Sequence, residues 1–277
     1  MSTVLIGVDA TARSEDAVAL ARQLARTLTG DVVVAAITHD RTAGHAAVRR
    51  MAGLLGPGIE PDRIRTAVLA APSPAQGLHE LAEAEAADLI VVGSTHTGRL
   101  GRVRPGSTGE RLLQGAPCAV AVAPHGFRTR LDPQLEQIGI AYNASREADC
   151  ALRTALALAD QTGAHVQAIT VIPLELYGTP PSAQAEIEAS MRVALDDAVA
   201  GTAAETVVLD GRPWAALAAK SAQLDLLIVG SRGYGPLHAV ITGGTSGPLI
   251  HHAHCPVLVV PRGVDTPLHR SAEALLG

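Results

Sequence analysis

Short, nearly uninterrupted apolar runs alternate along this chain with longer stretches in which apolar residues recur at helical spacing. One such stretch, Glu15–Thr27, is predicted as a helix, with Ser14 just before it as a natural N-cap. Apolar strands separated by helices are typical of a parallel sheet that is covered on both faces. The predicted strands are Val4–Val8, Val32–Ile37, Ile64–Leu69, Leu89–Val92, Ala119–Ala123, Ile138–Ala141, Val166–Val171, Glu205–Leu209, Leu226–Val229 and Val257–Val260.

The pattern occurs twice in the chain. The segment ADLIVVGS at residues 87–94 recurs as LDLLIVGS at 224–231, and APCAVAVAP at 116–124 recurs as AHCPVLVVP at 253–261. A repeat of this length indicates two copies of one domain. The polar segment between the copies, which contains Pro133, has no apolar periodicity and is predicted as a linker. We therefore expect a first domain at 1–125, a linker at 126–137, a second domain at 138–263 and a C-terminal tail at 264–277.

Composition excludes several classes of protein. A formal charge of −5 and an aromatic content of 2% do not fit a nucleic-acid-binding protein. No apolar run is long enough to span a membrane and the N-terminus has no leader pattern, so a soluble, cytoplasmic protein is expected. The three cysteines lack metal-site or disulfide spacing and are expected to be buried thiols. Lys220 is the single lysine, which excludes sites that need a loop lysine on a phosphate.

A glycine-rich loop follows the fourth strand of each copy. The first reads VVGSTHTGRLGRVRPGSTGE at residues 91–110, and the second reads IVGSRGYGPLHAVITGGTSGP at 228–248. Ligands of parallel sheets bind beyond the carboxyl ends of the strands, where the strand order reverses. The helix predicted to begin near Ser107 would present free N–H groups there to an anion. One such loop is ordinary turn chemistry, but two at the same spacing favour a function.

These loops resemble those of the universal stress protein family, whose signature is Gly-x2-Gly-x9-Gly-Ser/Thr between an apolar strand and a short helix. The resemblance covers nearly the whole chain, twice. It implies an α/β protein with two Rossmann-like, adenine nucleotide alpha hydrolase-like domains, each a five-stranded parallel sheet of order 3-2-1-4-5. It also implies a stress-response regulatory protein that binds ATP or another adenine nucleotide. The last strands would pair within the chain as a pseudo-dimer, or between chains as a homodimer.

The resemblance assigns nucleotide-binding residues in both domains. In the first, Asp9 would lie near the adenosine, where it either ligates Mg²⁺ or caps the turn after the strand. The backbone of Ile37 would meet the adenine. The first phosphate loop comprises Gly93, His96, Gly106, Ser107 and Thr108. The corresponding residues of the second domain are Asn143, Val171, Gly230, Gly233, Gly243, Gly244, Thr245 and Ser246.

Each loop departs from the family pattern. His96 replaces the second glycine of the first loop, while Gly244 replaces the Ser/Thr of the second and Asn143 replaces its aspartate. A β-carbon at residue 96 would cost about 1 kcal/mol or more if the backbone there needs a positive φ. The lost hydroxyl of the second loop can be replaced by Thr245 or Ser246. We therefore expect the second domain to be the better site. The positive charge that three arginines add to the first loop argues against this ranking. They are Arg99, Arg102 and Arg104.

The sequence favours binding over catalysis, because no nucleophile and base are paired in it. His96 has no nearby carboxylate in the sequence to orient it as a base. The cluster HHAHC at residues 251–255 resembles a metal site, but its spacing does not direct the side chains to one point, so no metal site is expected. A weak ATP hydrolase and a nucleotide-free interaction module with vestigial loops remain as alternatives.

Overall fold

The computed structural model describes residues 2–28, 30–56, 58–95, 100–130, 134–173, 180–231, 246–261, 263 and 268. Ten strands of these residues form one sheet, in the order β3-β2-β1-β4-β5-β10-β9-β6-β7-β8. Each half therefore has the predicted order 3-2-1-4-5. The strands are β1 (Thr3–Val8), β2 (Asp31–Ile37), β3 (Ile64–Leu69), β4 (Leu89–Gly93), β5 (Ala119–Ala123), β6 (Gln137–Ala141), β7 (His165–Pro173), β8 (Glu205–Gly211), β9 (Leu226–Gly230) and β10 (Val257–Val260).

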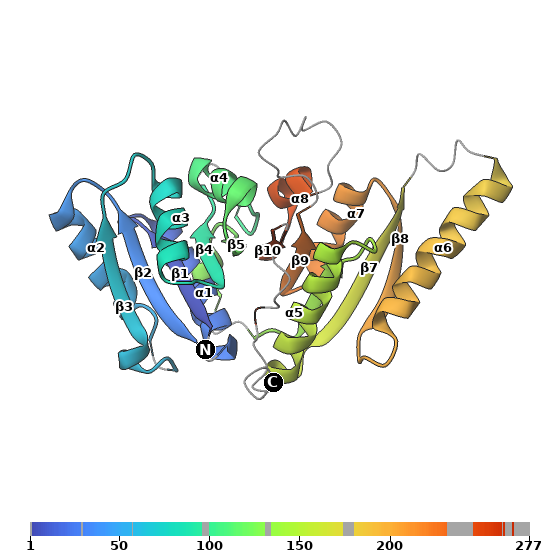
Figure 1. The fold of residues 1–277 in the computed structure, drawn as a ribbon, viewed down its shortest axis with the longest axis horizontal. Coiled ribbons are helices and arrows are strands. Elements are labelled where there is room, and N and C mark those ends of the chain that lie inside the picture. The colour runs from blue at the N-terminus through green and yellow to red at the C-terminus, as the bar shows by residue number, and fades with distance from the viewer. Residues whose placement is uncertain are drawn as a thin grey trace.

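The two halves join through their last strands. Strands β5 and β10 pair antiparallel, with Val122 opposite Val257 and Val120 opposite Val259, and the other strand pairs of the sheet are parallel. The two halves stand side by side about this junction (Figure 1). The predicted pairing within the chain is confirmed, and it covers two apolar edges that would otherwise invite aggregation.

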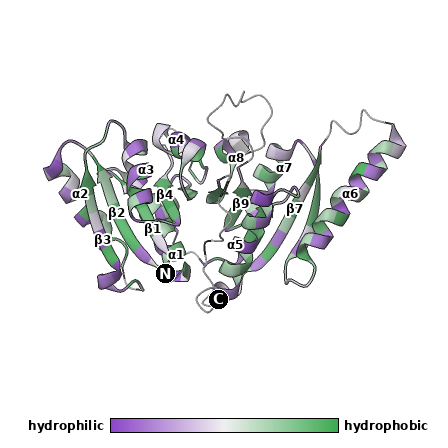
Figure 2. Ribbon diagram, viewed as in Figure 1, coloured by the Kyte–Doolittle hydropathy of each residue, from purple (hydrophilic) through white to green (hydrophobic). Residues whose placement is uncertain are grey.

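Helices cover both faces of the sheet. The first domain contains α1 (Ala12–Leu28), α2 (Arg41–Gly53), α3 (Pro74–Ala84) and α4 (Ser107–Gly115); the second contains α5 (Arg146–Thr162), α6 (Pro181–Val199), α7 (Pro213–Lys220) and α8 (Ser246–His252). Helices α1, α2, α5 and α6 pack into the core on one face, and α3, α4, α7 and α8 into the core on the other. The strands are apolar while the helices alternate polar and apolar surfaces (Figure 2), which is the pattern from which they are predicted.

Helix α1 begins earlier than predicted. It starts at Ala12, so Ser14 lies in its first turn and is not the N-cap. The Ser14 hydroxyl donates to the carboxylate of Asp9 and accepts the Asp9 backbone N–H, both at 2.7 Å. Ser14 does not cap α1 because its hydroxyl is bonded to the carboxylate and the backbone N–H of Asp9. In the second domain Ser145 does cap α5, accepting the N–H of Ala148 at 3.2 Å.

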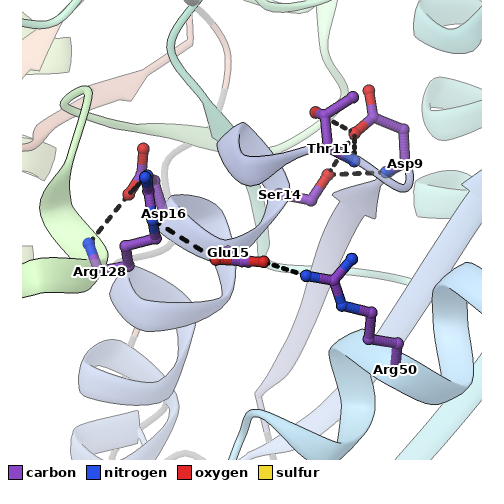
Figure 3. Close-up of polar contacts among 7 residues, drawn as sticks. All are labelled: Asp9, Thr11, Ser14, Glu15, Asp16, Arg50 and Arg128. Carbon is purple, nitrogen blue, oxygen red and sulfur yellow. Dashed lines mark hydrogen bonds and ion pairs between the residues drawn. The ribbon is translucent and has the colours of Figure 1, made fainter.

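Part of the predicted linker is folded against the first domain. The 3₁₀ helix η2 (Phe127–Thr129) follows β5, and Phe127 is buried. The carboxylate of Asp16, on α1, accepts the backbone N–H groups of Gly126 and Arg128, each at 2.9 Å. It also accepts the Arg128 guanidinium at 3.0 Å (Figure 3). The segment after β5 is therefore held by a buried carboxylate, and the linker at 126–137 stays a prediction.

Candidate functional site

A cavity of about 180 Å³ lies at the switch point of the first domain, beyond the carboxyl ends of β1 and β4. Its walls come from the ends of β1, β2 and β4, from the first turns of α1 and α4, and from α3, which contributes Pro74 and Leu78. Residues assigned from four separate segments of sequence therefore meet at one place. The lining includes Asp9, Ile37, Gly93, Gly106, Ser107 and Thr108.

The carboxylate of Asp9 accepts several hydrogen bonds at the edge of this cavity. It follows β1, and one carboxylate oxygen accepts the backbone N–H of Thr11 at 2.9 Å, the Thr11 hydroxyl and the Ser14 hydroxyl (Figure 3). The other oxygen accepts Nε of Arg13 at 2.7 Å and also binds its Nη2. Together these contacts occupy the four or so acceptor positions of a carboxylate. Asp9 thus caps the turn after the strand, and the arrangement does not fit a ligand of Mg²⁺.

The same contacts keep Asp9 ionised. Partial burial alone would raise the pKa of its carboxyl, but hydrogen bonds from Arg13, Thr11 and Ser14 outweigh it and lower the pKa to about 2. At neutral pH the cavity therefore contains a fixed carboxylate paired with a fixed guanidinium.

Gly93 is required by packing. A β-carbon on Gly93 would lie 2.1 Å from the carbonyl oxygen of Arg13, a distance at which atoms overlap. Gly230 has the same role in the second domain, where a β-carbon would lie 2.6 Å from Cβ of Glu147 and 2.9 Å from its carbonyl carbon. Both glycines let the end of a strand contact the first turn of α1 or α5. Close approach of a phosphate is not needed to explain them.

Helix α4 begins at the cavity without a side-chain cap. Its N-cap is Gly106, and the first turn includes Ser107 and Thr108. The free N–H groups of this turn and the positive end of the helix dipole favour an anion in front of them. The sequence predicts a phosphate at this position, and that stays a prediction.

The described ends of the loop between β4 and α4 contact each other and the second domain. At its base, Ser94 pairs with Pro105, and the Thr95 N–H donates to the Arg104 carbonyl at 2.8 Å. Arg102 donates to the carbonyl of His252 at the end of α8, at 2.5 Å. The expected contribution of Arg102 to phosphate binding is therefore not supported, because this side chain contacts the other domain. His96 and Arg99 lie outside the described residues.

Comparison with known proteins decides the family. The universal stress protein family matches residues 1–124 and again 135–261. The chain belongs to the universal stress protein family. A universal stress protein of Mycobacterium tuberculosis strain H37Rv is 31% identical over 199 residues, which cover 67% of this chain and 68% of that protein. A second one from the same strain is 31% identical over 181 residues, covering 62% of this chain and 61% of that protein.

Solved structures of the family share the fold over the whole tandem. A universal stress protein from Archaeoglobus fulgidus DSM 4304 matches with a TM-score of 0.67 at 20% identity, covering 95% of this chain and 97% of that one. A putative universal stress protein from Pseudomonas aeruginosa UCBPP-PA14 matches with a TM-score of 0.73 at 18% identity, covering 94% and 93%. At such identities the match is one of fold. Within the described ranges, no helix of this family member has the length and apolar character needed to span a bilayer.

The second universal stress domain is described only in part at the corresponding place. Asn143 is exposed and accepts the hydroxyl of Ser145 at 2.6 Å, and Val171 is buried at the end region of β7. Ser246 begins α8. The remaining predicted residues of this loop lie outside the described residues: Gly233, Gly243, Gly244 and Thr245.

Three described positions differ between the two universal stress domains in ways that affect a ligand. Gly7 and Ala35, which line the first cavity, pair across β1 and β2, and the equivalent pair across β6 and β7 is Ala141 with Ile169. Both side chains of the second pair are larger. The backbone and Cβ of Glu147 stand against Gly230 as those of Arg13 stand against Gly93, so an acidic residue takes the place of a basic one.

Arg13 is a residue of the candidate site that sequence reasoning missed. The sequence did contain a signal, since Arg13 lies four residues after Asp9 and a carboxylate and a guanidinium at that spacing can pair across one helical turn. The sequence predicts Ser14 only as an N-cap, whereas the structure shows that it also lines the cavity.

The HHAHC cluster packs at the junction of the domains. The ring of His252 lies against Trp214, with centroids 5.1 Å apart, and its Nδ1 is 2.7 Å from the Pro248 carbonyl. His251 is 3.9 Å from Glu110 of α4. Among the described residues no three His, Cys, Asp or Glu side chains are placed to share a metal ion. These histidines have packing and interdomain contacts instead.

Proposed function

We propose that this universal stress protein binds an adenine nucleotide in the cavity of its first domain and acts as a nucleotide-dependent regulatory protein. The observation that supports this most is the convergence of Asp9, Ile37, Gly93 and the start of α4 on one cavity. These segments are far apart in the sequence, and a parallel sheet brings them together where nucleotides are usually bound.

The chemistry of the lining agrees with the parts of a nucleotide. Apolar side chains of Ile37 and Leu78 can pack on an adenine ring, and Asp9 and Arg13 provide charged groups beside them. Ser107 and Thr108 add hydroxyls at the uncapped start of α4, which suits a phosphate. We propose binding and not turnover, in line with the sequence, which favours binding over catalysis.

The sequence-based expectation that the second domain binds more tightly stays a prediction, because most of its loop is outside the described residues. Its described part opposes that ranking. The side chains of Ile169 and Ala141 are larger than those of Ala35 and Gly7, which line the first cavity, and the acidic residue Glu147 takes the position of Arg13. On these grounds we favour the first domain.

Mass spectrometry of the small molecules that denaturation releases from the purified protein first shows whether a nucleotide is already bound. Calorimetric titration of ATP into the whole chain then tests the proposal. Thr108→Val is expected to weaken ATP binding, and the matched Thr245→Val should leave it nearly unchanged. If only Thr245→Val weakens binding, the second domain is the site. If purified protein contains no nucleotide and ATP produces no heat at millimolar concentration, the chain is a nucleotide-free interaction module and the proposal fails.

A further inference from the structure

We propose that Arg13 makes the first domain selective for adenine nucleotides that contain phosphate over adenosine. This inference rests on the proposed function. Arg13 and Asp9 are the two ionisable residues among the described lining of the cavity. Arg13 uses Nε and Nη2 on one oxygen of Asp9, and its Nη1 makes no hydrogen bond to any described residue. Its side chain is 44% exposed, so a ligand in the cavity can reach it.

The guanidinium is held in place before a ligand arrives. The backbone of Arg13 is in contact with Gly93, and its side chain is anchored on Asp9, which Thr11 and Ser14 fix in turn. An arginine held in this way loses little conformational freedom when it binds a phosphate. A guanidinium can also bind two acceptors at once, which lets Arg13 keep Asp9 while Nη1 contacts a phosphate oxygen.

The second domain provides an internal comparison. There Glu147 takes the place of Arg13 beside the glycine, and Asn143 takes the place of Asp9. The first cavity thus contains a cation whose Nη1 makes no hydrogen bond to a described residue, whereas an acidic residue takes the equivalent sequence position in the second domain. A phosphate-bearing ligand is therefore expected to bind the first domain more tightly than the second. For adenosine the difference in affinity between the domains should be much smaller.

The test is calorimetric titration of the full chain with ATP, AMP and adenosine. Arg13→Gln should weaken ATP binding by about tenfold or more, the effect of losing one charge-assisted hydrogen bond, and adenosine binding by less than about threefold. Arg13→Lys, which keeps the charge, should lose less ATP affinity than Arg13→Gln. Arg49→Gln, an exposed arginine on α2 away from the cavity, removes the same charge and should change neither affinity.

A double variant separates a direct contact from simple neutralisation of Asp9. If Arg13 only cancels the charge of Asp9, then Asp9→Asn/Arg13→Gln will regain the parental ATP affinity, and our inference is wrong. If Arg13 binds phosphate, the double variant stays weak for ATP. Equal losses for ATP and adenosine in Arg13→Gln, or no loss, would also overturn the inference while leaving the proposed function intact. Parental protein that binds neither ligand would overturn both.

Discussion

Replacing Gly93 by alanine is expected to damage the fold before it affects any ligand. The new methyl carbon would lie 2.1 Å from the carbonyl oxygen of Arg13 and 2.8 Å from its carbonyl carbon. Both are backbone atoms, so no side chain can turn away, and either the end of β4 or the start of α1 has to move. Overpacking of this kind costs about 1–3 kcal/mol. A shift of α1 would also displace Arg13, which lies in its first turn. It would thereby disturb Asp9, which Arg13 and Ser14 hold by hydrogen bonds.

The matched control is Gly53→Ala, at the last residue of α2, where a β-carbon would have nothing within 4 Å. Alanine there should be neutral or stabilise the helix by up to about 1 kcal/mol. Urea unfolding followed by circular dichroism should show a lower midpoint for Gly93→Ala and an equal or higher one for Gly53→Ala. If Gly93→Ala keeps the parental midpoint and loses only ATP affinity, the glycine serves the phosphate and our packing argument is refuted.

Three further predictions concern stability and the accessibility of the thiols. Asp16→Ala should lower the unfolding free energy by about 1–3 kcal/mol for each backbone N–H group that loses its acceptor, those of Gly126 and Arg128, while the Arg128 guanidinium keeps Glu15; an unchanged urea midpoint would contradict this. Asp9 has a pKa near 2, below its ordinary 3.8, so its stabilisation is complete above about pH 4 and is lost as the pH falls towards 2. Asp9→Asn should therefore show a flatter fall in stability over that range than the parent. The thiols of Cys118, Cys150 and Cys255 are buried, and burial raises the pKa of Cys118 and Cys255 to about 12, so a thiol reagent should react with them only after unfolding.

The strands could be predicted because a parallel sheet buries both faces of each strand. The run Val4–Val8 differs from the observed β1 by one residue, and the final strands match β5 and β10. Their pairing follows from the same fact, since two apolar edges in one chain cover each other. Where burial alone decides an element, the hydrophobic pattern is enough.

The start of α1 and the segment after β5 depend on partners that local sequence does not reveal. Asp9, Thr11 and Ser14 lie within one short stretch, and each is a residue type that can cap a helix or turn. The hydrogen bonds around Asp9 decide which of them does so. Residues 126–130 look like a polar linker, yet their partner Asp16 is 110 residues or more away in the sequence. Composition near a segment cannot predict a partner at such a separation.

The two glycine-rich loops show why counting matches to a motif is a weak guide to which copy is the better candidate site. By glycines, the second loop is the better preserved. Gly93 and Gly230, however, are both fixed by contact with the first turn of a helix, and this packing would preserve them whether or not a nucleotide is bound. Their presence therefore says little about affinity. What differs between the domains is the size and the charge of the residues at equivalent positions, namely Ala35 against Ile169 and Arg13 against Glu147. Ala35 and Arg13 line the first cavity, so under the proposed function these differences are the better basis for ranking the sites.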